Sequence, residues 1–295
     1  MRKNLKSVAV VVLSTLSLNV LACDLEGKTG FLPENNRYIP VGLKATGGIT
    51  EAQFNRVMDK MQSLYTKTVE KTGNKFVIER NWTDGTVNAY AHQKTPGVYT
   101  IAMFGGLARH QAVTEDAMAL VACHELGHHI GGAPKKTDGF GKAYWATNEG
   151  QADFWGGMKC LSHYLENENN VAVVKTMNVP ADVTKNCQLI YKNSNEVAIC
   201  QRVAMAGFAV GRMFNDLMGE TTLVNFNTPD KNVVQTTYHS HPDSQCRLDT
   251  YFQSALCDKG FSVEVSQTDE NTGVCSLRNG DKIGNRPFCW FKPQE

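Results

Sequence analysis

The sequence lacks several features that would place a chain in a particular class at once. Its 295 residues carry a formal net charge of +1, so the charge balance does not favour a nucleic acid or an acidic partner. It has no run of like charges, no low-complexity segment and no internal repeat, which argues against a disordered chain or a repeat protein. No C-x-x-C pair occurs, which argues against a zinc site built from cysteines. With 42% hydrophobic residues, the chain has the composition of a globular protein with a substantial core.

The strongest chemical signal that is present is the pattern H-E-x-x-H. It lies in the segment 115–130, where apolar residues recur at helical spacing and Thr114 stands in the position of an N-cap. Positions four apart share a helix face, so His124 and His128 can hold one metal ion together. Glu125 lies one step round the helix, where it can reach a water on that metal as a general base.

Two carboxylates downstream have the spacing of further site residues. Glu149 and Asp153 would share one face of a second helix. A catalytic zinc site needs three protein ligands and an open position for water, so Glu149 is the candidate third ligand. Asp153 can accept the far ring N–H of a ligand histidine, which fixes the tautomer of that histidine.

A third element, H-S-H-P, precedes a predicted helix over residues 243–256. His241 would lie at the helix entrance, where it can lean over the metal and stabilise the oxyanion of a tetrahedral intermediate. His239 competes with it for that role. Arg247 can pair with a buried carboxylate, for which Asp153 is the natural candidate.

These motifs, in this order, resemble the M48 family of zinc metallopeptidases, within the gluzincin clan. The family's N-A-[FY] segment, strand and Gly-Leu stretch also have counterparts before the metal helix, at residues 88–91, 98–101 and 105–107. The late H-P-x-x-x-x-R element matches His241, Pro242 and Arg247, and the resemblance covers residues 50–257. An ordered set of motifs is specific where each motif alone would not be.

The resemblance implies one zinc ion per chain. Its ligands would be His124, His128 and Glu149, while Glu125 would activate the water and His241 would assist the transition state. The resemblance also implies that one strand is the substrate-binding edge strand, formed by Val98, Tyr99, Thr100, Ile101 and Ala102. Such a strand presents unpaired N–H and C=O groups, so an extended, unfolded polypeptide can add to it with little demand on side chains. Strand alternation alone does not distinguish it from an ordinary half-buried strand.

The amino-terminal residues have the pattern of an export signal. Three basic residues precede an apolar run over residues 8–21, which is too short and too polar for a membrane span. We therefore expect a signal peptide over residues 1–22 and a mature chain that begins near Cys23. The neighbourhood of Cys23 also resembles a bacterial lipoprotein signal, which leaves a lipid anchor open. The expected location is the periplasm, or a membrane anchor facing it, rather than the extracellular medium.

The cysteine count is compatible with several pairings. An exported protein is expected to pair most of its nine cysteines. Without Cys23, eight remain, which is enough for four bridges only if Cys123 takes part. Cys123 directly precedes a candidate metal ligand inside a helix, where a buried free thiol is the expectation.

The expected fold is α+β and zincin-like, with a small mixed sheet that carries the edge strand and packs on helices including the H-E-x-x-H helix. Residues 51–72 and 195–218 have apolar residues at helical spacing. The domain would span residues 23–257, followed by a disulfide-tied extension over 258–295. His129 points to another helix face than His128 and is expected at the surface.

The sequence thus predicts a zinc-dependent endopeptidase that hydrolyses unfolded or envelope proteins in protein quality control. The alternative is an envelope chaperone or assembly factor whose zinc site is structural or latent, with His241 or His239 as a fourth ligand. Only three ligands are evident upstream, which favours catalysis. A secreted effector protease would carry the same motifs.

Overall fold

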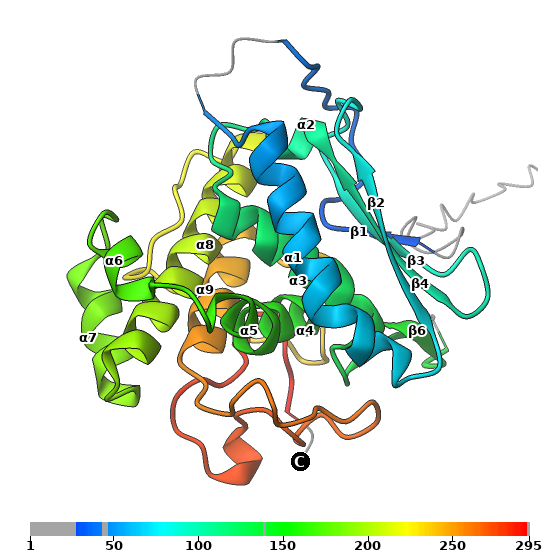
Figure 1. The fold of residues 1–295 in the computed structure, drawn as a ribbon. Coiled ribbons are helices and arrows are strands. Elements are labelled where there is room, and N and C mark those ends of the chain that lie inside the picture. The colour runs from blue at the N-terminus through cyan, green and yellow to red at the C-terminus, as the bar shows by residue number, and fades with distance from the viewer. Residues whose placement is uncertain (1–27, 43–46, 138–139, 294–295) are drawn as a thin grey trace, which may run out of the picture.

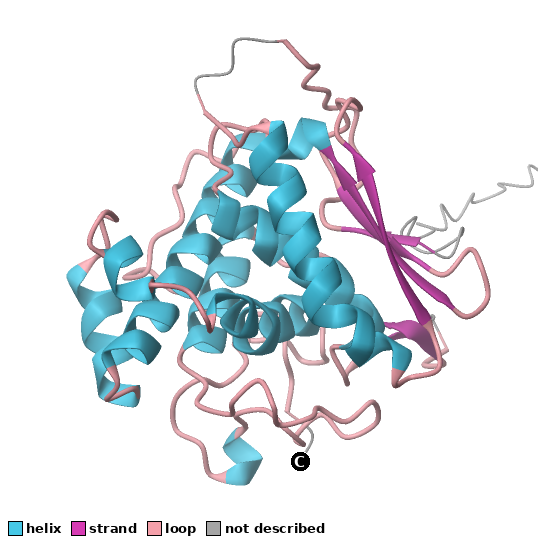
Figure 2. Ribbon diagram, in the orientation of Figure 1, coloured by secondary structure: helices cyan, strands magenta, loops and turns pink. Residues whose placement is uncertain are grey.

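The computed structural model describes residues 28–42, 47–137 and 140–293. The expected signal peptide and Cys23 lie outside these residues. The described chain is a mixed α+β structure, with a sheet on one side of a group of helices (Figure 2). The α+β class predicted from the sequence is confirmed.

The main sheet has four strands in the order β1-β3-β4-β2. In chain order they are β1 (Lys28–Gly30), β2 (Lys75–Asn81), β3 (Ala89–His92) and β4 (Val98–Phe104). Strand β4 runs parallel to β2 and antiparallel to β3, while β1 runs antiparallel to β3. The sheet is therefore mixed, with β1 and β2 at its edges.

The expectation that residues 98–102 form an edge strand is wrong. Val98, Tyr99, Thr100, Ile101 and Ala102 all belong to β4, which is an inner strand with a partner on each side. The backbone groups of β4 are paired with β2 and β3, so no peptide can add to it. Strand β3 has β4 on one side and only the three-residue β1 on the other.

The helices lie mainly on one face of the sheet (Figure 1). The longer ones are α1 (Glu51–Glu70), α3 (Glu115–Ile130), α7 (Ala181–Ile190), α8 (Ser194–Met218) and α9 (Ser244–Ala255). Shorter helical segments complete the group: α2 (Gly105–Ala108), α4 (Glu149–Trp155), the π-helical Gly156–Leu161, α5 (Ser162–Leu165), α6 (Asn170–Val174) and the 3₁₀ turn Leu277–Asn279. A separate hairpin pairs β5 (Lys135–Thr137) with β6 (Ala143–Thr147).

Helix α3 is the central element of the core. It begins where the sequence predicted, because the Thr114 side chain accepts a hydrogen bond from the Ala117 N–H at 3.1 Å. Every residue from Ala117 to His129 is buried, since α1, α4, α8 and the sheet all pack around it. Helix α8 is long and apolar enough to cross a membrane, but 67% of its most apolar window is buried inside the protein, as in a core helix.

Four disulfides tie the described chain together. They join Cys123 to Cys160, Cys187 to Cys200, Cys246 to Cys289 and Cys257 to Cys275. The expectation of a free Cys123 is therefore wrong. Its partner belongs to the π-helical segment, which packs against α3. Four bridges indicate an oxidising, extracytosolic environment.

Two of these bridges tie the carboxy-terminal extension, one to Cys246 in α9 and one to Cys257 just after that helix. The extension runs beneath α4 and α5 in Figure 1. Its Trp290 is fully buried and lies against Gly150, where a side chain of any size would collide with the indole ring. Arg286 donates to the Gln151 side chain at 3.2 Å. The extension therefore packs directly on the helix that carries Glu149.

Candidate metal centre

Three side chains from two helices meet at one point inside the protein. His124 and His128 come from successive turns of α3, and Glu149 comes from the first turn of α4. The two Nε2 atoms are 3.0 Å apart, and Glu149 Oε2 lies 3.1 Å from His124 Nε2 and 3.6 Å from His128 Nε2. The structure thus brings the three candidate ligands together, as one group able to hold a metal ion.

The distances within this group fit a small tetrahedral cation. Zinc–nitrogen and zinc–oxygen bonds of about 2.0–2.2 Å place neighbouring tetrahedral ligands roughly 3.3–3.6 Å apart. The three donor separations, 3.0–3.6 Å, are close to these values. Two imidazoles and one carboxylate are also a donor set that zinc accepts in catalytic sites.

Both histidines are fixed by a hydrogen bond at the ring nitrogen that faces away from the metal position. His128 Nδ1 donates to the Thr147 carbonyl oxygen at 2.8 Å, and His124 Nδ1 lies 2.6 Å from Asp153 Oδ1. Each Nε2 is therefore aimed at the centre, and the carboxylate makes His124 a more basic ligand. Burial alone would lower the pKa of His124, but the neighbouring carboxylates, Asp153 first, raise it to about 9.

Asp153 is itself held by a buried guanidinium. Arg247, from α9, donates from Nε and Nη2 to the two carboxylate oxygens, each at 2.7 Å. Tyr251 also donates to Asp153 Oδ1. Burial opposes ionisation of the carboxyl group, but Arg247 lowers the pKa of Asp153 to about 2. The guanidinium lies over the rings of Phe31 and Phe214, at 4.6 and 4.2 Å from their centroids, so the whole network is packed.

Glu125 directly follows the candidate ligand His124 on α3 and is fully buried. Among the described residues, neither oxygen of its carboxylate has a hydrogen-bond partner. Burial raises the pKa of Glu125 to about 8, against the opposing charge of His124. A carboxyl group in this environment readily takes up and returns a proton near neutral pH.

His241 lies beside the three candidate ligands without joining them. Its Nε2 is 3.6 Å from Glu149 Oε2, and it donates to the Gly30 carbonyl oxygen at 2.7 Å. The metal-binding group of the described chain contains neither His241 nor His239, so the structure offers three protein ligands and no fourth from these histidines. Burial lowers the pKa of His241, although the Glu149 carboxylate opposes this effect.

Sequence reasoning missed one charged residue of the centre. Lys136, on β5, is 3% exposed and places its Nζ 2.8 Å from Glu149 Oε1. Together with His241, Lys136 holds the pKa of Glu149 well below its usual range, although burial acts in the other direction. A lysine in a short polar strand carries no pattern that would distinguish it from a surface residue, so no sequence signal pointed to it.

The expectation for His129 is wrong. Its ring is buried between those of Tyr99 and Trp145, at centroid distances of 4.6 and 4.9 Å, and its Nε2 donates to the Thr100 carbonyl oxygen. Because the sheet covers this side of α3, a residue that faces away from the metal still faces protein. Burial lowers the pKa of His129 to about 3, so the ring is neutral.

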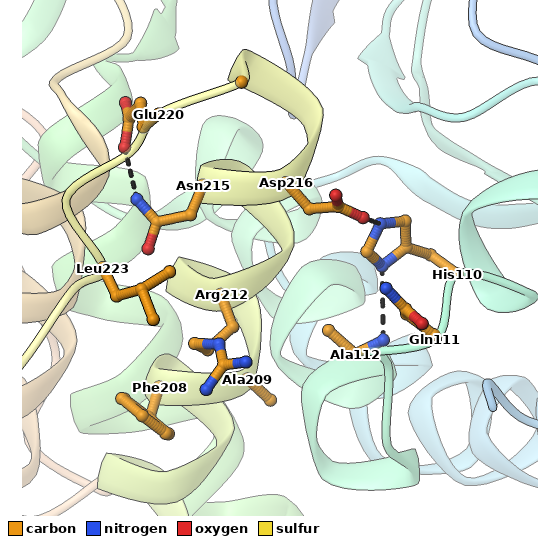
Figure 3. A pocket seen from close by; sticks show the side chains of 11 residues that line it. His110, Gln111, Ala112, Phe208, Ala209, Arg212, Asn215, Asp216, Glu220 and Leu223 are labelled. Carbon is orange, nitrogen blue, oxygen red and sulfur yellow. Dashed lines mark hydrogen bonds and ion pairs between the residues drawn. The ribbon is translucent and has the colours of Figure 1, made fainter. Parts of the chain in front are cut away.

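A large surface cavity lies away from the metal centre, between the segment around His110 and α8 (Figure 3). His110 Nε2 lies 2.9 Å from Asp216 Oδ2, and the Ala112 N–H donates to the other ring nitrogen. Two pairs of polar side chains that line this cavity are thus joined to each other, His110 with Asp216 and Asn215 with Glu220. The metal-binding residues have no part in its lining.

Compared with protein-family models, with curated proteins and with solved structures, the chain matches none. A function for this protein therefore has to be inferred from the residues of the centre and their geometry.

Proposed function

We propose that this protein is a zinc-dependent endopeptidase with a zincin-like fold, of the kind that the M48 resemblance implies. The observation that carries the proposal is the convergence of His124, His128 and Glu149 at tetrahedral distances, with the buried carboxylate of Glu125 beside them. One zinc ion per chain fits this donor set. Exported or envelope proteins in the periplasm are the proposed substrates, in agreement with the four disulfides.

The roles of the residues follow from their positions. A zinc ion, when bound, polarises the attacking water and the scissile carbonyl. Glu125 removes the proton from that water and delivers it to the leaving amine. His241 donates from Nε2 to the oxyanion, because the same atom already donates to a carbonyl oxygen in the structure. Asp153 and Arg247 keep His124 in the correct orientation.

The test is cleavage of casein by the purified mature chain, with the zinc content of each protein measured in parallel. We expect one zinc ion and cleavage in the parent, zinc without cleavage in Glu125→Gln, and neither in His124→Ala. Glu166→Gln, at an exposed glutamate, is the matched control and should behave as the parent. Undiminished cleavage by Glu125→Gln, or full zinc occupancy in His124→Ala, would contradict the assignment.

One observation favours a second function, that of an envelope chaperone or assembly factor with a latent zinc site. The side chains of His124, Glu125, His128 and Glu149 are all 0% exposed, so the centre is closed to solvent. The same experiment separates the two functions. Zinc in the parent and in Glu125→Gln, with cleavage by neither, would favour the chaperone, and suppression of aggregation of an unfolded envelope protein would then be the activity to measure.

A further inference from the structure

The metal centre is covered by a short segment of the protein's own amino-terminal part. Residues Gly30–Leu32 begin with the last residue of β1 and run along the outer side of β3, where their backbone continues the antiparallel pairing. The Phe31 N–H donates to the Ala89 carbonyl oxygen at 3.0 Å. The segment thus occupies the outer edge of β3, the edge that an extended peptide would need in order to pair with this strand.

Side chains next to the metal centre bind the peptide groups of this segment. His241 Nε2 donates to the Gly30 carbonyl oxygen at 2.7 Å, and Arg247 Nη1 donates to the Phe31 carbonyl oxygen at 2.8 Å. The Asn88 side chain accepts from the Leu32 N–H at 3.0 Å and donates to the Leu32 carbonyl oxygen at 3.1 Å. Successive peptide groups are therefore recognised through backbone atoms, as in the binding of an extended peptide ligand.

The Phe31 side chain anchors the segment. It is fully buried. The centroid of its ring lies 4.9 Å from that of the His124 imidazole, in a T-shaped arrangement, and 5.2 Å from that of the Phe214 ring. The Gly30 carbonyl, one peptide group earlier, points to His241, whose Nε2 is 3.6 Å from a candidate ligand atom of Glu149. The Gly30–Phe31 peptide bond is thus presented to the centre.

We propose that residues Gly30–Leu32 are a built-in peptide ligand, bound along β3 in the place and direction of a substrate. This inference rests on the proposed function and concerns the regulation of the same site. An outside peptide has to displace the segment before it can pair with β3. The peptides that compete best carry a bulky apolar residue directly after the carbonyl that faces His241, because Phe31 fills that position in the chain's own segment.

A glycine substitution provides a way to loosen the segment without touching a metal ligand. A Cβ atom at Gly30 would lie 2.9 Å from a ring atom of Tyr90 on β3 and 3.1 Å from the Leu32 carbonyl oxygen, so we expect Gly30→Val to crowd this contact and loosen the segment. At Gly260 the nearest such atom, Ser262 Oγ, is 4.0 Å away. Gly260→Val is therefore the matched control.

The experiment uses the zinc-loaded full chain carrying Glu125→Gln, so that no peptide is cut. A fluorescein-labelled peptide with the sequence of residues 28–35 is titrated, and the rate of zinc removal by EDTA is measured. We expect Gly30→Val to bind the peptide at least tenfold more tightly and to lose zinc at least tenfold faster than the parent and Gly260→Val. Equal affinities and equal rates in all three zinc-loaded proteins would overturn the proposal. A chain that holds no zinc would instead contradict the proposed function.

A second measurement covers the case in which Gly30→Val does not fold. A site for a sequence-specific protease is inserted after Asn36, in an exposed part of the chain, and the folded protein is cut there. Release of the amino-terminal peptide on dilution, with an unchanged circular dichroism spectrum, supports a displaceable ligand. A peptide that leaves only when the rest of the chain unfolds shows an integral strand and overturns the proposal. This measurement needs neither zinc nor cleavage of casein.

Discussion

Replacing Asp153 with asparagine tests the network that holds the metal helix in place. The change keeps the shape of the side chain but removes the charge that faces Arg247 and His124. Removal of one partner from a buried ion pair costs about 3–5 kcal/mol, because the remaining charge is left uncompensated. We expect Asp153→Asn to lower the free energy of unfolding of the chelator-treated protein at pH 7 by this amount.

The pH dependence of stability provides a sharper test of the same network. The pKa of Asp153 falls from 3.8 in the unfolded chain to about 2 in the folded protein, mainly because of Arg247 acting against burial. A lowered carboxyl pKa contributes stability that is complete above the unfolded value and is lost as the pH falls through the folded value. The ionised carboxylate of Asp153 therefore contributes roughly 2–3 kcal/mol of stability, which is lost progressively between about pH 5 and pH 1.

The assay is urea unfolding of the parent, Asp153→Asn and Asp182→Asn at pH 7, 4 and 2. Asp182 is an exposed aspartate and serves as the control for the loss of a carboxylate. The difference in stability between the parent and Asp153→Asn should shrink by about 2 kcal/mol from pH 7 to pH 2, with most of the change below pH 4. A difference that stays constant with pH, or an equal loss of stability in the control, would refute the role given to Asp153.

Three further predictions concern the same centre. The double variant Cys123→Ala/Cys160→Ala opens a loop with a sequence separation of 37, so urea unfolding should show a loss of about 4 kcal/mol; an unchanged midpoint would contradict this. His124 has a pKa that the neighbouring carboxylates, acting against burial, raise to about 9, so zinc binding at pH 7.5 should release a proton from it. Calorimetry in two buffers of different ionisation enthalpy measures this release, and identical heats would refute it. Lys136→Met removes the cation next to Glu149, so zinc should raise the melting temperature of this variant more than that of the parent; an equal or smaller increase would exclude that role for Lys136.

The parts of this structure that could be predicted from the sequence are those determined locally. The bounds of α3 follow from helical periodicity and from the Thr114 cap, which acts on a backbone group three residues away. The convergence of His124 and His128 follows from the pitch of one helix. The place of Glu149 in the centre could be predicted from the spacing of Glu149 and Asp153 in the sequence, because their helix, α4, packs directly on α3.

The errors concern contacts between distant segments. Strand alternation in residues 98–102 is the same for an inner and for an outer strand, and the position of β4 is decided by its parallel pairing with β2. The sequence predicted a free thiol at Cys123 because its own helix contains no second cysteine. The partner, Cys160, lies in a π-helical segment that packs against α3 from later in the chain. Neither fact can be derived from a window of neighbouring residues.

In the same way, the candidate ligands of the centre could be predicted from the sequence, whereas the residues that cover the centre could not. Metal ligands have to be arranged with a fixed geometry, so their spacing along a helix is a recognisable pattern. The side chains that cover the centre only have to lie close to it, so their positions in the sequence follow no motif. They are Phe31, after a three-residue strand, and Lys136, on a short hairpin. Phe31 directly follows a strand of three residues, and Lys136 belongs to one. We expect these two segments, rather than the helices, to move when the site opens, because α3 and α4 stay anchored by the core and by the Cys123–Cys160 bridge.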